Sequence, residues 1–539
     1  MYPFLDSIPL GPLEGVTRDI SSIDIDQSKH ETDEEHRALL YRVLFANVGF
    51  DILYEKRIRR CLFESLDLSA LRSFCDEHRL DTANGRPFDL ALVASNVPWR
   101  AGSVFVFDFG RLFSINPVYL PRREDRPSSV EIVEPSEELP ELFPYQWEMK
   151  RQIDDFLARK DARAAMLQLP TGAGKTRTAV ESLTDLTCKS VMRDDARLFI
   201  WLAHTEELCD QAAETIIRIW RRRGSIRLPL IRLWGDYDLD VNAVPGAVVI
   251  SSFSKLLSWR RRNPDWHFVS DHFSVVVIDE AHRALAPTMR EMVETVIASN
   301  RGKVLGLTAT PGRGEIDQRE SRRLAELFGK SLLVPISLGD DPIATLQRDG
   351  VLADLQWEVL ETGIEAAAPR NDDEGAEDAP PRLLRLLAAN DTRNELIVDR
   401  VSAGVRDGRQ VLIYACTVEH ARTLASLLAA RGIATASIDS RMRSWQRRAL
   451  IASFRRGDIQ VLSNFGVLST GFDAPNISLI VVCRPTSSAV LYAQMVGRGL
   501  RGPRAGGTKE CLVVDVRDNL TNYGDLAAVY SSFGQFWRT

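Results

Sequence analysis

The sequence predicts an α/β protein in which two tandem, doubly wound parallel sheets carry the function. Apolar, β-branched runs of strand length alternate with helix-length segments through residues 141–539, as expected for strand–helix–strand units. The runs are continuously apolar, which is typical of parallel strands buried on both faces. Because strand–helix–strand crossings are right-handed, helices are expected on both faces of each sheet.

Changes in composition divide the chain into five segments. The first predicts helices at 36–50 and 66–78 and strands at 88–93 and 104–109, hence an α+β accessory domain. The second segment, residues 122–140, is rich in Pro, Ser and acidic residues, as linkers are. The fourth contains an Ala-, Asp-, Glu- and Pro-rich stretch at 365–381 that predicts a mobile loop. The expected segments are the accessory domain at 1–121, the linker at 122–140, the first lobe at 141–335, the connector at 336–382 and the second lobe at 383–539.

A glycine-rich turn from Leu169 to Thr176 follows an apolar run and leads into a helix-length segment. Gly172 and Gly174 allow backbone N–H groups to converge on phosphate oxygens. Lys175 supplies a positive charge, and the Thr176 hydroxyl can bind Mg²⁺. The full phosphate-loop motif begins with Gly where this chain has Leu169, so an ordinary strand–turn–helix connection is the alternative.

Two carboxylates end a second buried strand, predicted at 275–278. Asp279 can hold the Mg²⁺ that bridges the β- and γ-phosphates, and Glu280 can orient or deprotonate the attacking water. Taken alone, the pair could instead be the acidic start of the next helix. Thr308-Ala-Thr310 follows after another helix-sized interval, which favours the catalytic interpretation.

Ordered motifs of this kind resemble those of the superfamily 2 helicases and translocases, including the Asp-Glu-Ala-His tetrad of the DEAH-box group. The resemblance spans Leu142 to Val516. The residues in these motifs are most similar to those of bacterial RadD-type DNA repair helicases, and more loosely to those of the UvrB, XPB and restriction-enzyme motor subunits. Those relatives carry Arg where this chain has Phe143. The matching segments are the adenine-reading Gln146, motif I at 169–176, motif Ia at 204–208, motif II at 279–282, motif III at 308–310, motif IV at 411–417, motif V at 466–475 and motif VI at 494–501.

The resemblance implies two RecA-like lobes that share one ATP site with Mg²⁺. Arg498 and Arg501, spaced i, i+3 on one face of an expected helix, would reach the γ-phosphate from lobe two; a salt-bridged surface pair is the alternative. Catalysis would use Lys175, Glu280, Arg498 and Arg501, and Thr176 and Asp279 would bind the metal. The implied nucleotide contacts are Gln146, Thr171, Gly172, Ala173, Gly174, Lys175, Thr176, Gly471 and Asp473, and the implied nucleic-acid contacts are Thr205, Ser251, Ser252, Thr417 and Thr470.

Composition limits the class of protein. With 45% apolar and 26% charged residues the chain is globular, and it contains neither a membrane-length apolar run nor a signal-like start. Cytoplasm is therefore the expected location. The seven cysteines are scattered, which favours reduced core residues over a metal module. A net charge of −6 does not indicate nucleic-acid binding, and the arginine clusters at 218–227, 260–262 and 441–448 are either local binding patches or solvated faces.

The sequence thus predicts an ATP hydrolase, specifically an ATP-dependent DNA helicase or translocase that couples hydrolysis between two lobes to movement. DNA repair or restriction-like antiviral defence is the expected role. An RNA helicase is one alternative, and an ATP-gated scaffold subunit of a larger defence complex is another. The accessory domain is expected to select the DNA structure or to dock a repair or defence protein.

Overall fold

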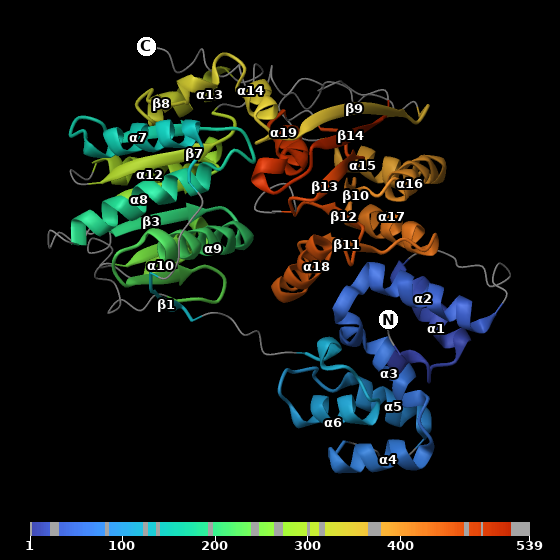
Figure 1. Ribbon diagram of the computed structural model, residues 1–539. Coiled ribbons are helices and arrows are strands. Elements are labelled where there is room, and N and C mark those ends of the chain that lie inside the picture. The colour runs from blue at the N-terminus through green and yellow to red at the C-terminus, as the bar shows by residue number, and fades with distance from the viewer. Residues whose placement is uncertain are drawn as a thin grey trace.

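The computed structural model describes residues 3–21, 32–80, 86–121, 128–135, 141–191, 198–238, 247–262, 273–298, 302–311, 318–364, 379–467, 474–486 and 489–518. They form an N-terminal helical domain and two α/β lobes, which lie side by side with the N-terminal domain below lobe two in Figure 1.

The described part of the N-terminal domain is helical, so the expectation of an α+β domain was wrong here. The stretches expected as strands are helices α5 and α6. Continuous apolar runs do not distinguish a buried helix from a strand, and the local signals favour helix: Pro87 occupies the first turn of α5, and the Ser103 hydroxyl caps α6 by accepting from Val106 N at 3.3 Å. The elements are η1 (Pro3–Leu5), α1 (Leu10–Ser21), α2 (Asp33–Val48), η3 (Gly49–Tyr54), α3 (Lys56–Glu64), α4 (Leu68–Glu77), α5 (Pro87–Asn96), α6 (Val104–Leu112) and η4 (Pro117–Tyr119).

Lobe one is built on a sheet with strand order β1-β4-β5-β3-β6-β7-β2-β8. All pairings are parallel except that of β1, which pairs antiparallel with β4 and lies in the stretch expected as linker. The strands are β1 (Val130–Val133), β2 (Ala164–Gln168), β3 (Leu198–Ala203), β4 (Leu228–Leu233), β5 (Val248–Ser252), β6 (Phe273–Asp279), β7 (Lys303–Thr308) and β8 (Leu332–Leu333). Its helices are α7 (Pro144–Ala158), α8 (Lys175–Val191), α9 (Glu206–Arg223), α10 (Phe253–Arg262), η6 (Ala281–Arg283), α12 (Pro287–Ala298) and α13 (Gln318–Leu327).

Lobe two is built on a parallel sheet with order β11-β12-β10-β13-β14-β9. Its edge strand β9 comes from the expected connector and pairs with β14 from Asp354 to Glu361. The strands are β9 (Asp354–Glu361), β10 (Gln410–Tyr414), β11 (Thr435–Asp439), β12 (Val461–Phe465), β13 (Ile477–Val482) and β14 (Glu510–Arg517). The remaining helices are η8 (Ile336–Leu338), α14 (Pro342–Arg348), α15 (Pro381–Ala388), α16 (Asp391–Arg406), α17 (Val418–Ala430), α18 (Ser444–Arg456), α19 (Ala489–Val496), η10 (Gly497–Gly499) and η11 (Pro503–Ala505).

The N-terminal domain packs directly on lobe two. Leu39, Val43 and Ala46 of α2 form a buried apolar cluster with Ala425 and Ala429 of α17. Beside the cluster, the amide of Asn47 donates to the Ser426 hydroxyl at 2.7 Å. A flexibly tethered module is therefore the wrong description of this domain, because part of its core is shared with lobe two.

Among the described helices, none combines the length and the apolar character that crossing a bilayer requires. The seven cysteines are unpaired, and six of them are buried, whereas Cys61 is half-buried.

Candidate nucleotide site between the two lobes

Three predicted motifs meet at one edge of the lobe-one sheet. Strand β7 lies between β6 and β2, and both pairings are parallel. The carboxyl ends of the three strands therefore lie together, and each carries a motif: the loop of residues 169–176 after β2, Thr308 at the end of β7, and Asp279 at the end of β6. Ligands of open parallel sheets bind at this edge.

The loop after β2 has the backbone conformation that a phosphate-binding turn needs. Gly172 and Gly174 have φ of 85° and 84°, which side chains with a Cβ rarely adopt. The first residue of α8 is Lys175, so the N-terminus of α8 faces the loop and favours a bound anion. Leu169, which departs from the motif, is fully buried in the lobe-one core.

Gln146 of α7 holds this loop in place through hydrogen bonds of its side chain. Its side-chain oxygen accepts from Phe143 N at 3.0 Å, and its Nε2 donates to the Ala173 carbonyl at 3.2 Å. Tyr145 donates its hydroxyl to the same carbonyl at 2.9 Å. A Cβ on Gly174 would lie 2.4 Å from the Gln146 Nε2, so glycine is required there by close approach as well as by φ. The contact of Gln146 with adenine stays a prediction.

Phe143 meets a guanidinium from lobe two. The Arg504 guanidinium carbon lies 4.8 Å from the centre of the Phe143 ring, within cation–π range. Arg504 follows motif VI in the sequence, and motif reasoning had not singled it out. The Phe143 ring at the start of α7 is therefore in contact with a positive charge from lobe two.

The ammonium group of Lys175 interacts electrostatically with charged groups of both lobes. Its Nζ donates to the Leu169 carbonyl at 3.1 Å and to the Pro170 carbonyl at 3.4 Å. Burial lowers the pKa of Lys175, and the carboxylates of Glu280 and Asp279 oppose this shift. Arg498 of lobe two lowers the Lys175 pKa further. Charges from motifs I, II and VI therefore act on one another in a single site.

Asp279 is suited to a cation. Its carboxyl is buried and accepts from Glu280 N at 3.0 Å. Burial raises the pKa of Asp279, the Glu280 carboxylate raises it further, and Lys175 opposes the shift. Within the described residues, no three His, Cys, Asp or Glu side chains gather as a metal site. Mg²⁺ commonly binds to one or two protein oxygens and completes its shell with phosphate and water, which is compatible with Asp279 and the Thr176 hydroxyl.

Glu280 has a left-handed backbone, with φ 51° and ψ 50°. Such a conformation costs a non-glycine residue about 1–3 kcal/mol, and it directs the chain into η6 directly after β6. His282 in η6 links two motifs, because its Nδ1 lies 3.5 Å from Glu280 Oε2 and 3.2 Å from the Thr308 hydroxyl. The Thr308 hydroxyl in turn donates to the Thr310 carbonyl at 3.0 Å. Sequence reasoning had assigned no role to His282, although its place in the tetrad was visible.

Motif VI of lobe two lies directly on the phosphate loop. A Cβ on Gly497 would lie 2.8 Å from the Thr171 Cβ, and a Cβ on Gly172 would lie 3.8 Å from the Arg501 Cγ. The expectation that Arg498 and Arg501 share one helical face was wrong. Arg498 lies in the short η10 turn, and Arg501 lies beyond it, in a bridge to Leu352. Glycines on both sides of Arg498 disfavour continuation of α19.

Four of the five predicted nucleic-acid residues belong to the described part of the chain, and they form two pairs. Thr205 and Thr417 occupy equivalent places after β3 and β10, where their hydroxyls cap α9 and α17 at 3.3 Å and 3.0 Å. Ser251 is fully buried and donates its hydroxyl to the Leu233 carbonyl at 2.8 Å, and its contact with nucleic acid stays a prediction. Ser252 is 5% exposed and accepts from the Lys255 amide at 3.3 Å. The motif V predictions Thr470, Gly471 and Asp473 lie outside the described residues.

Family comparisons match the two lobes separately. The family described as type III restriction enzyme, res subunit, matches residues 139–313, and the helicase conserved C-terminal domain matches residues 392–502. The chain carries the paired core domains of superfamily 2 helicases. Together the two matched domains are those of an ATP-hydrolysing helicase.

Curated relatives share this pair of domains with the chain. IRC3 of Saccharomyces cerevisiae, named as an ATP-dependent helicase, is 26% identical over 358 residues, which are 64% of this chain and 47% of IRC3. The 51.5 kDa protein of a Lactococcus phage is 24% identical over 337 residues, 62% of each chain. PRP28 of Yarrowia lipolytica, named as a pre-mRNA-splicing ATP-dependent RNA helicase, is 22% identical over 352 residues, 62% of this chain and 56% of PRP28. The aligned region thus spans about half to two thirds of these relatives.

The fold matches solved helicase structures. The DEAD-box helicase Mss116 bound to ssRNA and UDP-BeF superposes with a TM-score of 0.50 at 18% identity, covering 70% of each chain. The paired RecA-like lobes predicted from the sequence are confirmed by this likeness.

Proposed function

We propose that this chain is a DNA-directed motor that couples ATP hydrolysis between its lobes to movement along nucleic acid. The observation that carries the proposal is the contact of Gly497 in lobe two with Thr171 in the phosphate loop of lobe one. A triphosphate held by the loop would meet charges from both lobes, so hydrolysis would depend on their closure.

Each charged group has a defined task in this proposal. Lys175 and the loop amides hold the phosphates, and Thr176 and Asp279 would hold Mg²⁺, which supplies charge neutralisation when bound. Glu280 orients the attacking water and accepts its proton. Arg498 and Arg501 stabilise the charge that develops on the γ-phosphate. Gly471 and Asp473 stay predicted nucleotide contacts.

The proposed nucleic-acid path crosses the starts of α9 and α17. Beyond the N–H groups that Thr205 and Thr417 cap, the first turn of a helix has further N–H groups with no acceptor inside the helix, and such groups bind phosphates without reading sequence. With a phosphate contact on each lobe, closure and reopening would shift the lobes relative to the strand. The remaining proposed contacts are Ser251, Ser252 and Thr470.

The match to a restriction-enzyme family supports DNA as the substrate. RNA is the second candidate, because PRP28 and DBP3 of Yarrowia lipolytica are named as RNA helicases. We further propose a role in DNA repair or restriction-like defence in the cytoplasm, with the N-terminal domain contributing substrate selection or a protein contact.

The test is a partner-free ATPase assay with single-stranded DNA, duplex DNA and RNA, with Glu280→Gln as the inactive control. Stimulation by DNA well above that by RNA supports the proposal. Stimulation by RNA alone would replace it with an RNA helicase. No hydrolysis above the Glu280→Gln level under any condition would contradict a motor and favour the ATP-gated scaffold.

A further inference from the structure

Helix α18 of lobe two touches both other parts of the molecule. On one side, the Gln446 amide donates to the Val48 carbonyl of the N-terminal domain at 2.6 Å. Gly49 fits closely against this contact, since a Cβ there would lie 3.1 Å from the Gln446 Nε2 and 3.2 Å from the Leu450 Cδ2. Gly49 also has a φ of 54°, so the junction requires glycine.

Arg443, the N-cap residue of α18, is held by the same domain. Its guanidinium carbon lies 3.3 Å from the centre of the Tyr54 ring, and its Nη1 lies 3.6 Å from the Asp51 carboxylate. Asp51 is largely buried, and burial raises its pKa to about 6 although Arg443 opposes the shift. Arg443 and Gln446 therefore form a clamp that fixes the first turn of α18 to the N-terminal domain.

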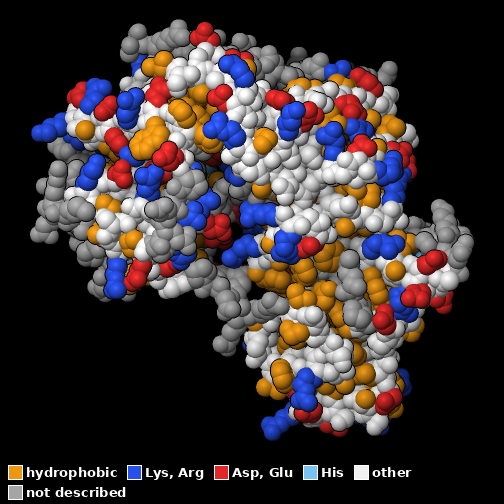
Figure 2. All heavy atoms as spheres, viewed as in Figure 1, with side chains coloured by type: hydrophobic (Ala, Val, Ile, Leu, Met, Phe, Trp, Pro, Cys, Tyr) orange, Lys and Arg blue, Asp and Glu red, His pale blue; other side chains and the backbone are white. Residues whose placement is uncertain are grey.

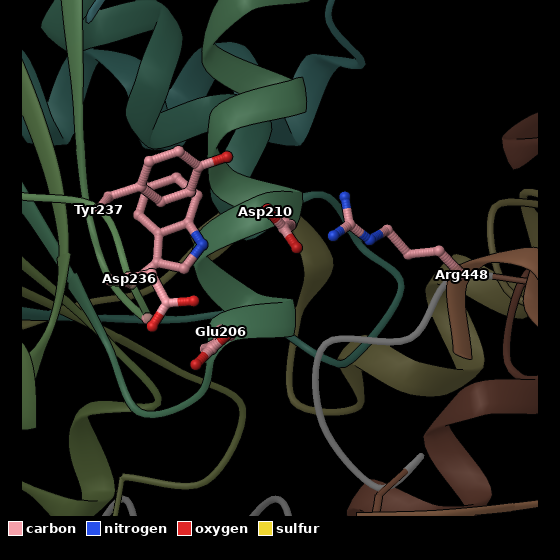
Figure 3. A pocket seen from close by; sticks show the side chains of 7 residues that line it. Glu206, Asp210, Asp236, Tyr237 and Arg448 are labelled. Atoms are coloured by element: carbon pink, nitrogen blue, oxygen red, sulfur yellow. The ribbon is translucent and has the colours of Figure 1, made fainter. Parts of the chain in front are cut away.

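The next two residues of α18 face lobe one. Arg447 forms an ion pair with Glu207 in the first turn of α9, and it also donates to the Met442 carbonyl at 2.8 Å. Arg448 extends toward Asp210 on α9, as Figure 3 shows. Asp210 and Trp234 of lobe one line a pocket that Arg448 of lobe two also lines. In Figure 2, basic side chains gather on the lobe-two side of the hollow between the lobes, opposite acidic ones.

The clamp and the inter-lobe contacts all lie within residues 443–448, at the start of α18. A helix of this length moves as a rigid body, so the position of its first turn determines where Arg447 and Arg448 lie. The N-terminal domain is therefore connected to lobe one through α18.

We propose that the N-terminal domain controls closure of the two lobes by holding α18 where Arg447 and Arg448 meet α9. This inference deepens the proposed function, because closure is the step that assembles the ATP site. Phosphates of a nucleic acid entering between the lobes would compete with Glu207 and Asp210 for the two arginines. The domain thus sets how readily the motor closes before nucleic acid binds.

The test measures the closed fraction of the full chain by energy transfer between one dye on each lobe, with and without a non-hydrolysable ATP analogue. The clamp variant combines Arg443→Ala with Gln446→Ala, and the contact variant combines Arg447→Ala with Arg448→Ala. Arg456→Ala is the matched control, because Arg456 lies at the far end of α18, where it pairs with Asp458 and donates to the Ser453 hydroxyl at 3.0 Å.

Each variant pair should lower the closed fraction at least about fivefold, and all four substitutions together should lower it no further, because both pairs act through one helix. Arg448→Asp should also open the lobes, and Asp210→Arg should restore closure in that background. A clamp variant that closes like wild type, or an effect that multiplies in the fourfold variant, would overturn the proposal.

Two further measurements keep this test separate from the proposed motor activity. Tyr54→Leu removes the ring beneath Arg443 without touching α18, and it should reproduce the clamp effect even if the clamp variant folds poorly. The nucleotide-free closed fraction reports on α18 even in a chain that hydrolyses no ATP. Failure of the motor therefore appears as lost ATPase with an intact closure response.

Discussion

Gly497 of lobe two lies so close to Thr171 of lobe one that a Cβ on Gly497 would stand 2.8 Å from the Thr171 Cβ and 3.1 Å from its hydroxyl oxygen. The φ of Gly497 does not require glycine, so the reason for glycine here is space. The chain therefore brings motif VI onto the phosphate loop by removing a side chain at the point of contact.

Gly497→Ala should hold the lobes apart and reduce kcat at least about tenfold, because small misplacements of catalytic groups have large effects on rate. The melting temperature should change little, since the contact lies between lobes and not in either core. Gly11→Ala, at a position with nothing within 4 Å of the added Cβ, is the control. Wild-type kcat in Gly497→Ala would show that this contact is not part of the active arrangement.

Lys175→Ala should abolish ATP hydrolysis, because the positive charge beside the phosphates is lost, while circular dichroism stays that of wild type. Glu280→Gln should instead bind ATP and stall, since Asp279 still supports the metal but water activation is lost. Equilibrium binding of a fluorescent ATP analogue distinguishes the two. Loss of nucleotide binding in Glu280→Gln would mean that Glu280 has a different role.

A chain beginning at Glu138 should be less stable than the full chain and prone to association. Removing α2 exposes Ala425 and Ala429 of α17, and removes the partner of Ser426. Thermal unfolding and light scattering measure this. Ala429→Glu in the shortened chain should reduce association, whereas the same change in the full chain should destabilise it by burying an unpaired charge. Full stability of the shortened chain would contradict this prediction, because it would show that packing of the N-terminal domain does not stabilise lobe two.

Asp210→Asn should raise the melting temperature at pH 8 but not below the ordinary carboxyl pKa of 3.8. The pKa of Asp210 is raised to about 6, chiefly by burial and also by nearby Glu214, Glu207 and Glu206, although Arg448 opposes the shift. The folded chain thus binds this proton more tightly than the unfolded chain, so this carboxyl lowers stability progressively as pH rises from 3.8 through about 6. Asn removes that penalty. Equal melting temperatures at pH 8 would contradict the raised pKa.

The two lobes were predictable because their central strands are continuous apolar runs and their motifs end those strands. Strand β11 has no continuous apolar run that would predict it, because Thr435, Ser437 and Asp439 are polar in sequence, although the structure buries them. Strand β9 was missed because its residues are mostly exposed or half-buried at a sheet edge. Helices α5 and α6 were taken for strands because their short apolar runs have no evident helical period.

Much of the candidate site was predictable, but the contacts between domains were not. Gly172, Gly174, Lys175 and Asp279 were identified from local spacing, because one loop and one strand end determine them. The docking of α2 depends on alanines of α17, which carry no sequence signal of an interface. Arg447 and Arg448 were visible only as part of a basic cluster, and their partners on α9 are set by tertiary structure.

The most direct test of a site shared by two lobes is single-turnover ATP hydrolysis by Arg498→Ala and Arg501→Ala, with Arg456→Ala as the control. Both arginines belong to lobe two, whereas the phosphate loop belongs to lobe one. The account predicts that each variant binds ATP with nearly wild-type affinity and hydrolyses it at least about a hundredfold more slowly, because these contacts form chiefly in the closed, reacting state. Rates within a few-fold of wild type for both variants would contradict it.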